Sequence, residues 1–284
     1  EKTAFPLNDQ PYASLFKIYQ KEFLDVSVEK GLIHKDSLAL AGDGTPVVTS
    51  HRERKKRICK CKENGINDCS CDRYFSQPDC DIGWDSSRDC FYHGYDLYML
   101  VDSQSDLPVF PHYSYASKHD SHGFLQAFFR MRAFLPDYKV SKVLLDSAHD
   151  AMPYYQYFKR QNITPFIDLN SKAGRPPVYK NDFTIDKDGV PVCPAGHRMR
   201  RDGIEAAKGR MKFKCPKISH AGGCISCTCD NPCSNAKYGR TVHLVLNDNP
   251  RLFNNPPRSS KEWKQEYNAR TSVERSNKRE KLDF

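Results

Sequence analysis

The sequence has no apolar run that approaches the about 20 residues needed to cross a bilayer. Its first residues also lack the basic and then apolar pattern of a secretory signal. Hydrophobic residues make up only 38% of the 284 residues, although aromatic residues reach 12%. We therefore expect a cytoplasmic protein without a membrane partner, large enough for one large or two small domains. Because the chain begins with Glu rather than Met, we also expect it to be a piece of a longer protein.

Acidic residues are too few to balance the basic ones. The 44 Lys and Arg residues face 35 Asp and Glu residues, which leaves a formal net charge of +9. Such an excess favours an anionic partner, and nucleic acid is the commonest large one. Many of the cations lie in three stretches, at 51–62, 198–214 and 266–281. One basic stretch is as often a solvated face as a binding surface, but three together favour a polyanion.

Hydrophobic periodicity predicts a mixed α/β protein. Helices are expected at 14–33, 121–136, 153–162 and 266–281, and strands within 37–47, 92–117 (two strands), 138–150 and 163–170. The first strand is expected to end at Asp43, because Gly44 and Pro46 follow it. Asp146 is expected at the C-terminal end of the fourth strand.

This order of elements resembles the ribonuclease H-like fold, a five-stranded mixed sheet in the order 3-2-1-4-5 flanked by helices. Two Cys-rich segments interrupt the pattern, one after the first strand and one between the fifth strand and the last helix. We expect a helical lead-in at 1–33 and a sheet domain at 34–170 plus 251–284. The insertions are a basic, Cys-rich one at 51–90 and a Cys-rich, β-containing one at 171–250.

Four aspartates lie at strand ends, and the sheet order separates them: Asp43, Asp102, Asp146 and Asp168. In the expected order the first and fourth strands are adjacent and parallel, so Asp43 and Asp146 would meet at one edge. The second strand runs antiparallel, which sends Asp102 to the opposite edge. Asp168 would lie two strands from Asp43, about 10 Å away. A single strand-end Asp is more often a turn or cap residue, but two on adjacent parallel strands indicate a shared site.

The expected C-terminal helix is almost entirely polar and charged. At about 100° per residue, Tyr267, Arg270, Glu274 and Lys281 fall within a sector of roughly 60°. Two interpretations are open. The face is solvated and held by pairs such as Arg270 with Glu274, or it contacts an anionic partner and metal ions.

The spacing of these four residues, Y-(2)-R-(3)-E-(6)-K, resembles the signature of a large class of DDE transposases of bacterial insertion sequences. GDGTPV around Asp43 and LLDSAHDA around Asp146 are similar to the first two acidic motifs of that class, and the resemblance covers about residues 33–284. It implies metal-dependent DNA cleavage and strand transfer at the ends of a mobile element. It also implies the terminal inverted repeats and target DNA as partners, a homodimer in the DNA complex, and a place at the bacterial nucleoid.

The implied chemistry explains the residue types. Two divalent ions about 3.5 to 4 Å apart can bind the attacking and leaving oxygens of one phosphodiester, and Mg²⁺ or Mn²⁺ takes carboxylate ligands. The resemblance implies that Asp43 bridges both ions, while Asp146 and Glu274 each hold one. Lys and Arg suit phosphate, and a Tyr hydroxyl can donate to it. The implied DNA contacts are Tyr267, Arg270, Lys278 and Lys281.

Two other functions stay open at this stage. A domesticated or inactive relative would bind DNA without cutting it, although the three carboxylates Asp43, Asp146 and Glu274 argue against that reading. A structure-selective ribonuclease H-like nuclease would lack the accompanying Tyr, Arg and Lys.

The twelve cysteines form two groups. Without a secretory signal, disulfides are less expected than metal binding or free thiols. The close spacing of CPAGH and CISCTCDNPC is typical of zinc sites, so a zinc ion is expected more strongly in the second group than in the first. The second group comprises Cys193, Cys215, Cys224, Cys227, Cys229 and Cys233, and the first comprises Cys59, Cys61, Cys69, Cys71, Cys80 and Cys90.

Overall fold

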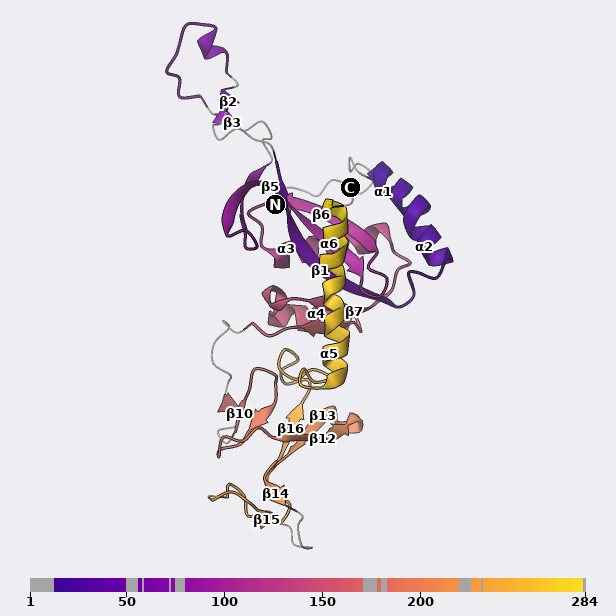
Figure 1. Cartoon of the computed structure of the whole chain (residues 1–284), viewed down its shortest axis with the longest axis vertical. Helices are drawn as coiled ribbons and strands as arrows, with labels where there is room; N and C mark the ends of the chain where they lie inside the picture. The colour runs from indigo at the N-terminus through magenta and orange to yellow at the C-terminus, as the bar shows by residue number, and fades with distance from the viewer. Residues whose placement is uncertain are drawn as a thin grey trace. The chain divides into compact units, whose positions relative to one another are not determined.

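The computed structural model describes residues 13–49, 56–57, 59–71, 73–74, 80–170, 178–179, 183–219, 226–230 and 232–282 (Figure 1). The chain divides into two compact units. Unit 1 comprises the described residues up to Lys142 together with those from Arg270 onward, and unit 2 comprises those from Val143 to Ala269.

A six-stranded mixed sheet has the order β4-β5-β1-β7-β8, with β6 also paired to β5. Strand β5 runs antiparallel to β1, β4 and β6, whereas β1, β7 and β8 are parallel. The five expected strands are therefore confirmed in the expected order, and β4 is an additional one. The strands are β1 (Leu38–Val48), β4 (Asp81–Asp85), β5 (Cys90–Asp102), β6 (Pro108–Tyr115), β7 (Val140–Leu145) and β8 (Thr164–Ile167).

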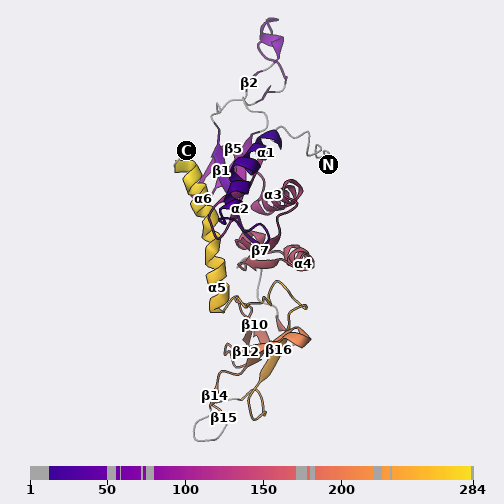
Figure 2. The same cartoon turned by 90° about the vertical axis from the view of Figure 1, so that its right-hand side faces the viewer.

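The helices lie close to their expected positions. The first is α1 (Ala13–Tyr19), a π-helical turn (Gln20–Leu24) and α2 (Asp25–Glu29) in succession. The others are α3 (Asp120–Phe134), α4 (Met152–Arg160), α5 (Lys261–Asn268) and α6 (Ser272–Leu282). Within unit 1, α3 and α6 lie on opposite sides of the sheet formed by β1 and β5 (Figure 2).

The prediction that β1 ends at Asp43 is wrong. The strand continues for five more residues, with register pairs from Gly44 with Tyr98 to Val48 with Gly94. A strand can continue wherever a neighbouring strand offers backbone hydrogen bonds. Because β5 is 13 residues long, it pairs with β1 beyond Gly44 and Pro46. Asp43 therefore lies inside a strand rather than at its end.

The core of unit 1 is aromatic. Tyr98 of β5 is fully buried, and α3 approaches it closely at Gly123, where an added Cβ would lie 2.9 Å from the Tyr98 ring. Phe16 of α1 packs edge-on against Phe110 and Phe134, with centroids 4.9 and 5.0 Å apart. These contacts attach α1 to β6 and α3.

The expected C-terminal helix is not continuous. A 3₁₀ turn, Ala269–Thr271, separates α5 from α6. Glu274 and Lys281 both belong to α6 and lie seven residues apart, so they remain on one face. Tyr267 lies in unit 2, so its place on that face stays a prediction.

Helix α6 is held by a narrow face of small side chains and by ion pairs. Its buried residues are Ser272, Val273, Ser276 and Asn277, which let it lie close to β1 and β5 in unit 1. Arg275 donates two hydrogen bonds to the Asp106 carboxylate, at 2.8 and 2.7 Å, in the turn between β5 and β6. A polar helix can thus stay ordered without a wide apolar stripe.

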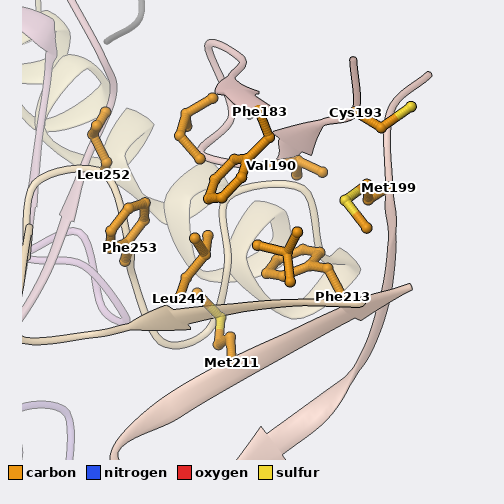
Figure 3. Close-up of a cluster of buried hydrophobic side chains, with 11 residues drawn as sticks. Phe183, Val190, Cys193, Met199, Met211, Phe213, Leu244, Leu252 and Phe253 are labelled. Carbon is orange, nitrogen blue, oxygen red and sulfur yellow. The ribbon is translucent and has the colours of Figure 1, made fainter. Parts of the chain in front are cut away.

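The described residues within 171–250, in unit 2, form small sheets. The short strands β9 (Val178–Tyr179), β10 (Phe183–Ile185) and β11 (Pro191–Val192) form one sheet. A second contains β12 (Arg200–Glu205), β13 (Arg210–Lys214) and β16 (Thr241–Val245). Two further pairs are β14 (Ile218–Ser219) with β15 (Ser226–Cys227) here, and β2 (Lys56–Arg57) with β3 (Arg73–Tyr74) in unit 1. Eleven buried side chains, including Phe183, Phe213 and Phe253, make a separate apolar core (Figure 3).

A buried polar network in unit 2 joins residues 150–170 to residues 251–258. The Asp150 side chain is fully buried and accepts hydrogen bonds from Tyr155, from the backbone of Asn170 and from Nε and Nη2 of Arg251. Arg258 in turn donates to the hydroxyl of Tyr155 at 2.9 Å. Buried charges persist only when paired and hydrogen-bonded in this way.

Among the described residues, no helix is long and apolar enough to cross a membrane.

Candidate active site

Three of the predicted site residues lie together in unit 1. Arg270 Nη2 donates to Glu274 Oε1 at 2.6 Å, and Arg270 Nη1 lies 3.9 Å from Asp43 Oδ2. Asp43 comes from the middle of β1, Arg270 from the 3₁₀ turn and Glu274 from the first turn of α6. The Arg270 side chain is only 19% exposed, whereas Glu274 is 50% exposed. One guanidinium therefore joins two carboxylates from opposite ends of the chain.

A polar hollow of about 290 Å³ opens beside Asp43, next to Gly44. A Cβ on Gly44 would lie 2.5 Å from Asp120 Oδ1 and 3.0 Å from both carboxylate oxygens of Asp96. Two further carboxylates thus lie against the backbone that follows Asp43, and a side chain at position 44 would require them to shift. Lys281 of α6 also lines this hollow.

Asp96 is the most perturbed acid of this group. It is 6% exposed, and its Oδ2 has no hydrogen-bond partner among the described residues. Burial raises the pKa of Asp96 to about 7, and repulsion from Asp120 and Asp43 adds to the rise, while Lys281 opposes it. Neither Asp96 nor Asp120 was predicted from the sequence as a site residue. Asp96 could have been noticed as a charged residue among the apolar residues of β5.

Asp146 belongs to unit 2 and is held by its neighbours in sequence. Its Oδ1 accepts from the backbone of Ala148 at 3.0 Å and from His149 Nδ1 at 2.6 Å. The His149 side chain is fully buried and its ring meets Tyr154 edge-on. Two donors therefore orient this carboxylate, which stays 35% exposed.

The remaining predicted site residues differ in their surroundings. Tyr267, in unit 2, stacks on the buried Trp263 with ring centroids 4.6 Å apart and 18° between the planes. Lys278 and Lys281 are exposed on α6. Asp102 accepts hydrogen bonds from the backbone and hydroxyl of Ser105, as a turn residue does, and Asp168 is exposed.

The basic stretch at 198–214 is largely paired within unit 2. Arg198 pairs with Asp186 and Asp188, Arg210 pairs with Glu205, and Lys212 and Lys214 both pair with Asp202. These cations neutralise local acids, which favours the solvated-face interpretation for them. Of the stretch at 51–62, residues 51–55 and 58 lie outside the described residues.

Four cysteines of the first group form a cluster that could hold a metal ion: Cys59, Cys61, Cys69 and Cys71. Their sulfur atoms all lie within 4.8 Å of one another. A hydrogen bond from Cys59 lowers the pKa of the Cys69 thiol to about 7, whereas the pKa of Cys61 is raised to about 12, chiefly by its own hydrogen bond with Cys59.

The second cysteine group has a different setting. Cys193 packs in the apolar core of Figure 3 and Cys215 is also buried, whereas Cys229 and Cys233 are half-buried. Cys224 and the side chain of Cys227 lie outside the described residues. Among the described cysteines, only those of the first group gather into such a cluster, so zinc in the second group stays a prediction.

Comparisons with protein-family models, with curated proteins and with solved structures found no match to this chain.

Proposed function

We propose that the protein is a DDE transposase with a ribonuclease H-like catalytic domain, which cuts DNA at the ends of a mobile element and joins them to a target. The observation that carries the proposal is the Arg270 link between Asp43 and Glu274. Two of the three acidic motif residues, far apart in the sequence, occur in one unit with the motif's arginine between them. The third, Asp146, directly follows β7, the strand adjacent to β1 in the sheet.

The donor atoms suit divalent cations. Asp43, Asp146 and Glu274 offer carboxylate oxygens, the ligands that Mg²⁺ and Mn²⁺ prefer. The carboxyl groups of Asp96 and Asp120 crowd the same stretch of β1, and such crowding is relieved by cations. When bound, two such ions would stabilise the charge on the attacking and leaving oxygens of a phosphodiester.

The side chains around the carboxylates have supporting roles in this proposal. Arg270 neutralises Asp43 and Glu274 while no cation is bound, and then turns its planar fork to a DNA phosphate. His149 keeps the Asp146 carboxylate in one orientation through its short hydrogen bond. Lys278 and Lys281 are exposed cations on the same helix as Glu274 and contact the DNA backbone. Tyr267 contributes its hydroxyl to a phosphate while its ring rests on Trp263.

The DNA partners in this proposal are the element's terminal inverted repeats and the target, bound by a homodimer. The test is cleavage of a plasmid that carries the coding region with its flanking sequences. Incubation with the full chain and Mg²⁺, followed by mapping of the 3′-OH ends, is expected to reveal cuts at two positions that flank the gene. Cuts at branched or single-stranded junctions anywhere in the plasmid would instead favour the structure-selective nuclease.

Matched variants separate the site from general damage. Asp43→Asn, Asp146→Asn and Glu274→Gln are each expected to lower cleavage by at least about a hundredfold, since each removes charge stabilisation in the transition state, while most DNA binding remains. Asp168→Asn, a change at an exposed strand-end aspartate, should leave cleavage unchanged. Full Mg²⁺-dependent cleavage by any of the three site variants would refute the assignment. DNA binding without cleavage by the wild-type protein would favour the inactive relative.

A further inference from the structure

The insertion after β1 contains a compact segment with almost nothing apolar to hold it. Every residue from Cys59 to Cys71 is half-buried or exposed, and its one large hydrophobic residue, Ile66, is 50% exposed. The backbone nevertheless forms hydrogen-bonded turns. A 3₁₀ turn (Lys60–Lys62) leads into Gly65, which has a φ of +75°, and the amide of Ile66 donates to the carbonyl of Cys61 at 2.8 Å.

A segment this short cannot be stabilised by hydrophobic burial, so it needs a cross-link. The cysteines are the available groups. Cys59 and Cys69 approach to 3.4 Å between sulfur atoms, and Cys61 and Cys71 approach to 3.6 Å. Two separate disulfides would require only these two pairwise approaches, each closing to about 2.05 Å. All four sulfur atoms, however, lie within 4.8 Å of one another, which pairwise bonding does not require.

The spacing fits a tetrahedral ion. Four thiolates at about 2.3 Å from a zinc ion are about 3.8 Å from one another, close to the two sulfur separations above. The ligand pattern is symmetric, with one residue inside each pair of cysteines, Cys59 with Cys61 and Cys69 with Cys71. Lys60 and Lys62 alternate with the first pair and are exposed. Their charges offset part of the double negative charge that four thiolates and one divalent cation carry.

We propose that Cys59, Cys61, Cys69 and Cys71 bind one zinc ion, which acts as the structural cross-link of the insertion after β1. Four protein ligands leave no open position for water or substrate, and closed sites of this kind stabilise a fold rather than catalyse a reaction. The site is separate from the carboxylates of Asp43 and Glu274 and uses none of their side chains. It also changes the expectation from the sequence, where the second cysteine group was the favoured zinc site.

The first test is metal analysis of the purified full chain. Cys61→Ser and Cys69→Ser are each expected to lose one equivalent of zinc relative to the wild-type protein. Cys90→Ser is the matched control, because Cys90 belongs to the same sequence group and is exposed but lies outside the cluster, so it should keep all its zinc. Because the measurement counts a difference of one ion, zinc bound elsewhere in the chain does not affect it.

The second test keeps the native ligands and needs neither DNA nor a folded variant. Replacing zinc by Co²⁺ in the wild-type chain should produce the intense absorption of a tetrahedral thiolate site. Chelation should open the segment, so that trypsin cuts after Lys60 or Lys62 only in the metal-free protein. Equal zinc in Cys61→Ser and Cys90→Ser, iron in place of zinc, or an intact mass with two disulfides would overturn the proposal. Protection of Lys60 and Lys62 after complete metal removal would also overturn it.

Discussion

Asp96→Asn should stabilise unit 1, and more strongly at higher pH. Asp96 is 6% exposed, and its carboxylate faces Asp120 of α3, Asp43 of β1 and Lys281 of α6. Because burial and the two acids raise its pKa from the usual 3.8 to about 7, folding keeps it protonated where the unfolded chain does not. The resulting contribution is fully present below pH about 4 and is lost as pH rises to about 7. Asparagine stays uncharged at every pH, so the variant does not lose this stability as pH rises.

The magnitude follows from the shift in pKa. At about 1.36 kcal/mol per pKa unit, the raised pKa of Asp96 destabilises the folded state, relative to a side chain that stays uncharged, by about 2 kcal/mol at pH 5 and about 4 kcal/mol at pH 8. The free energy of unfolding of Asp96→Asn, relative to wild type, should therefore increase by about 2 to 3 kcal/mol between pH 5 and pH 8.

The assay is urea unfolding at both pH values in buffer without divalent cations, which keeps Asp43 free of metal. A Trp263→Phe background leaves Trp84 of β4 as the reporter, since the chain has 2 tryptophans and Trp84 lies in unit 1. Asp102→Asn is the control, because this buried aspartate of the same strand accepts two hydrogen bonds from Ser105 and its loss should destabilise. An Asp96→Asn effect that is equal at pH 5 and pH 8 would refute the reasoning.

Three other perturbations have expected outcomes. His149→Ala removes the 2.6 Å hydrogen bond to Asp146 and should lower Mg²⁺-dependent cleavage about 10- to 100-fold, with a raised Mg²⁺ requirement. Unchanged Mg²⁺ dependence would contradict the orienting role. Gly44→Ala should lower both stability and cleavage, because its Cβ would meet the Asp120 carboxylate at 2.5 Å; a variant that melts and cleaves like wild type would show that the carboxylates move aside. Hydrogen bonds from Arg275 lower the pKa of Asp106, so the contribution of this pair to stability is present above pH about 4 and is lost as pH falls through the lowered value. Arg275→Ala should therefore destabilise at pH 7 but have less effect in acid, and an equal loss at both would exclude the ion pair as the cause.

The sequence alone was sufficient for features that depend on local pattern. Apolar runs between turn residues located the five expected strands, because a buried strand needs such a run whatever its partners are. The order of those strands also followed, since short connections and parallel crossovers leave few arrangements. The spacing of Arg270 and Glu274 predicted their pairing, because residues four apart on a helical surface are neighbours.

Other features depended on contacts between distant segments. The extension of β1 past Asp43 required the long partner β5, which local turn signals do not report. The crowding at Gly44 required α3 and β5 to bring Asp120 and Asp96 to one point.

The cysteine cluster and the terminal helix also depend on tertiary contacts that the sequence pattern does not report. Close spacing occurs in both cysteine groups, but only the fold determines which sulfur atoms converge, and among the described side chains those are the four of the first group. The single C-terminal helix expected from the sequence is interrupted by the 3₁₀ turn between α5 and α6. Sequence periodicity assumes an uninterrupted helix, whereas packing decides where a helix changes its pitch.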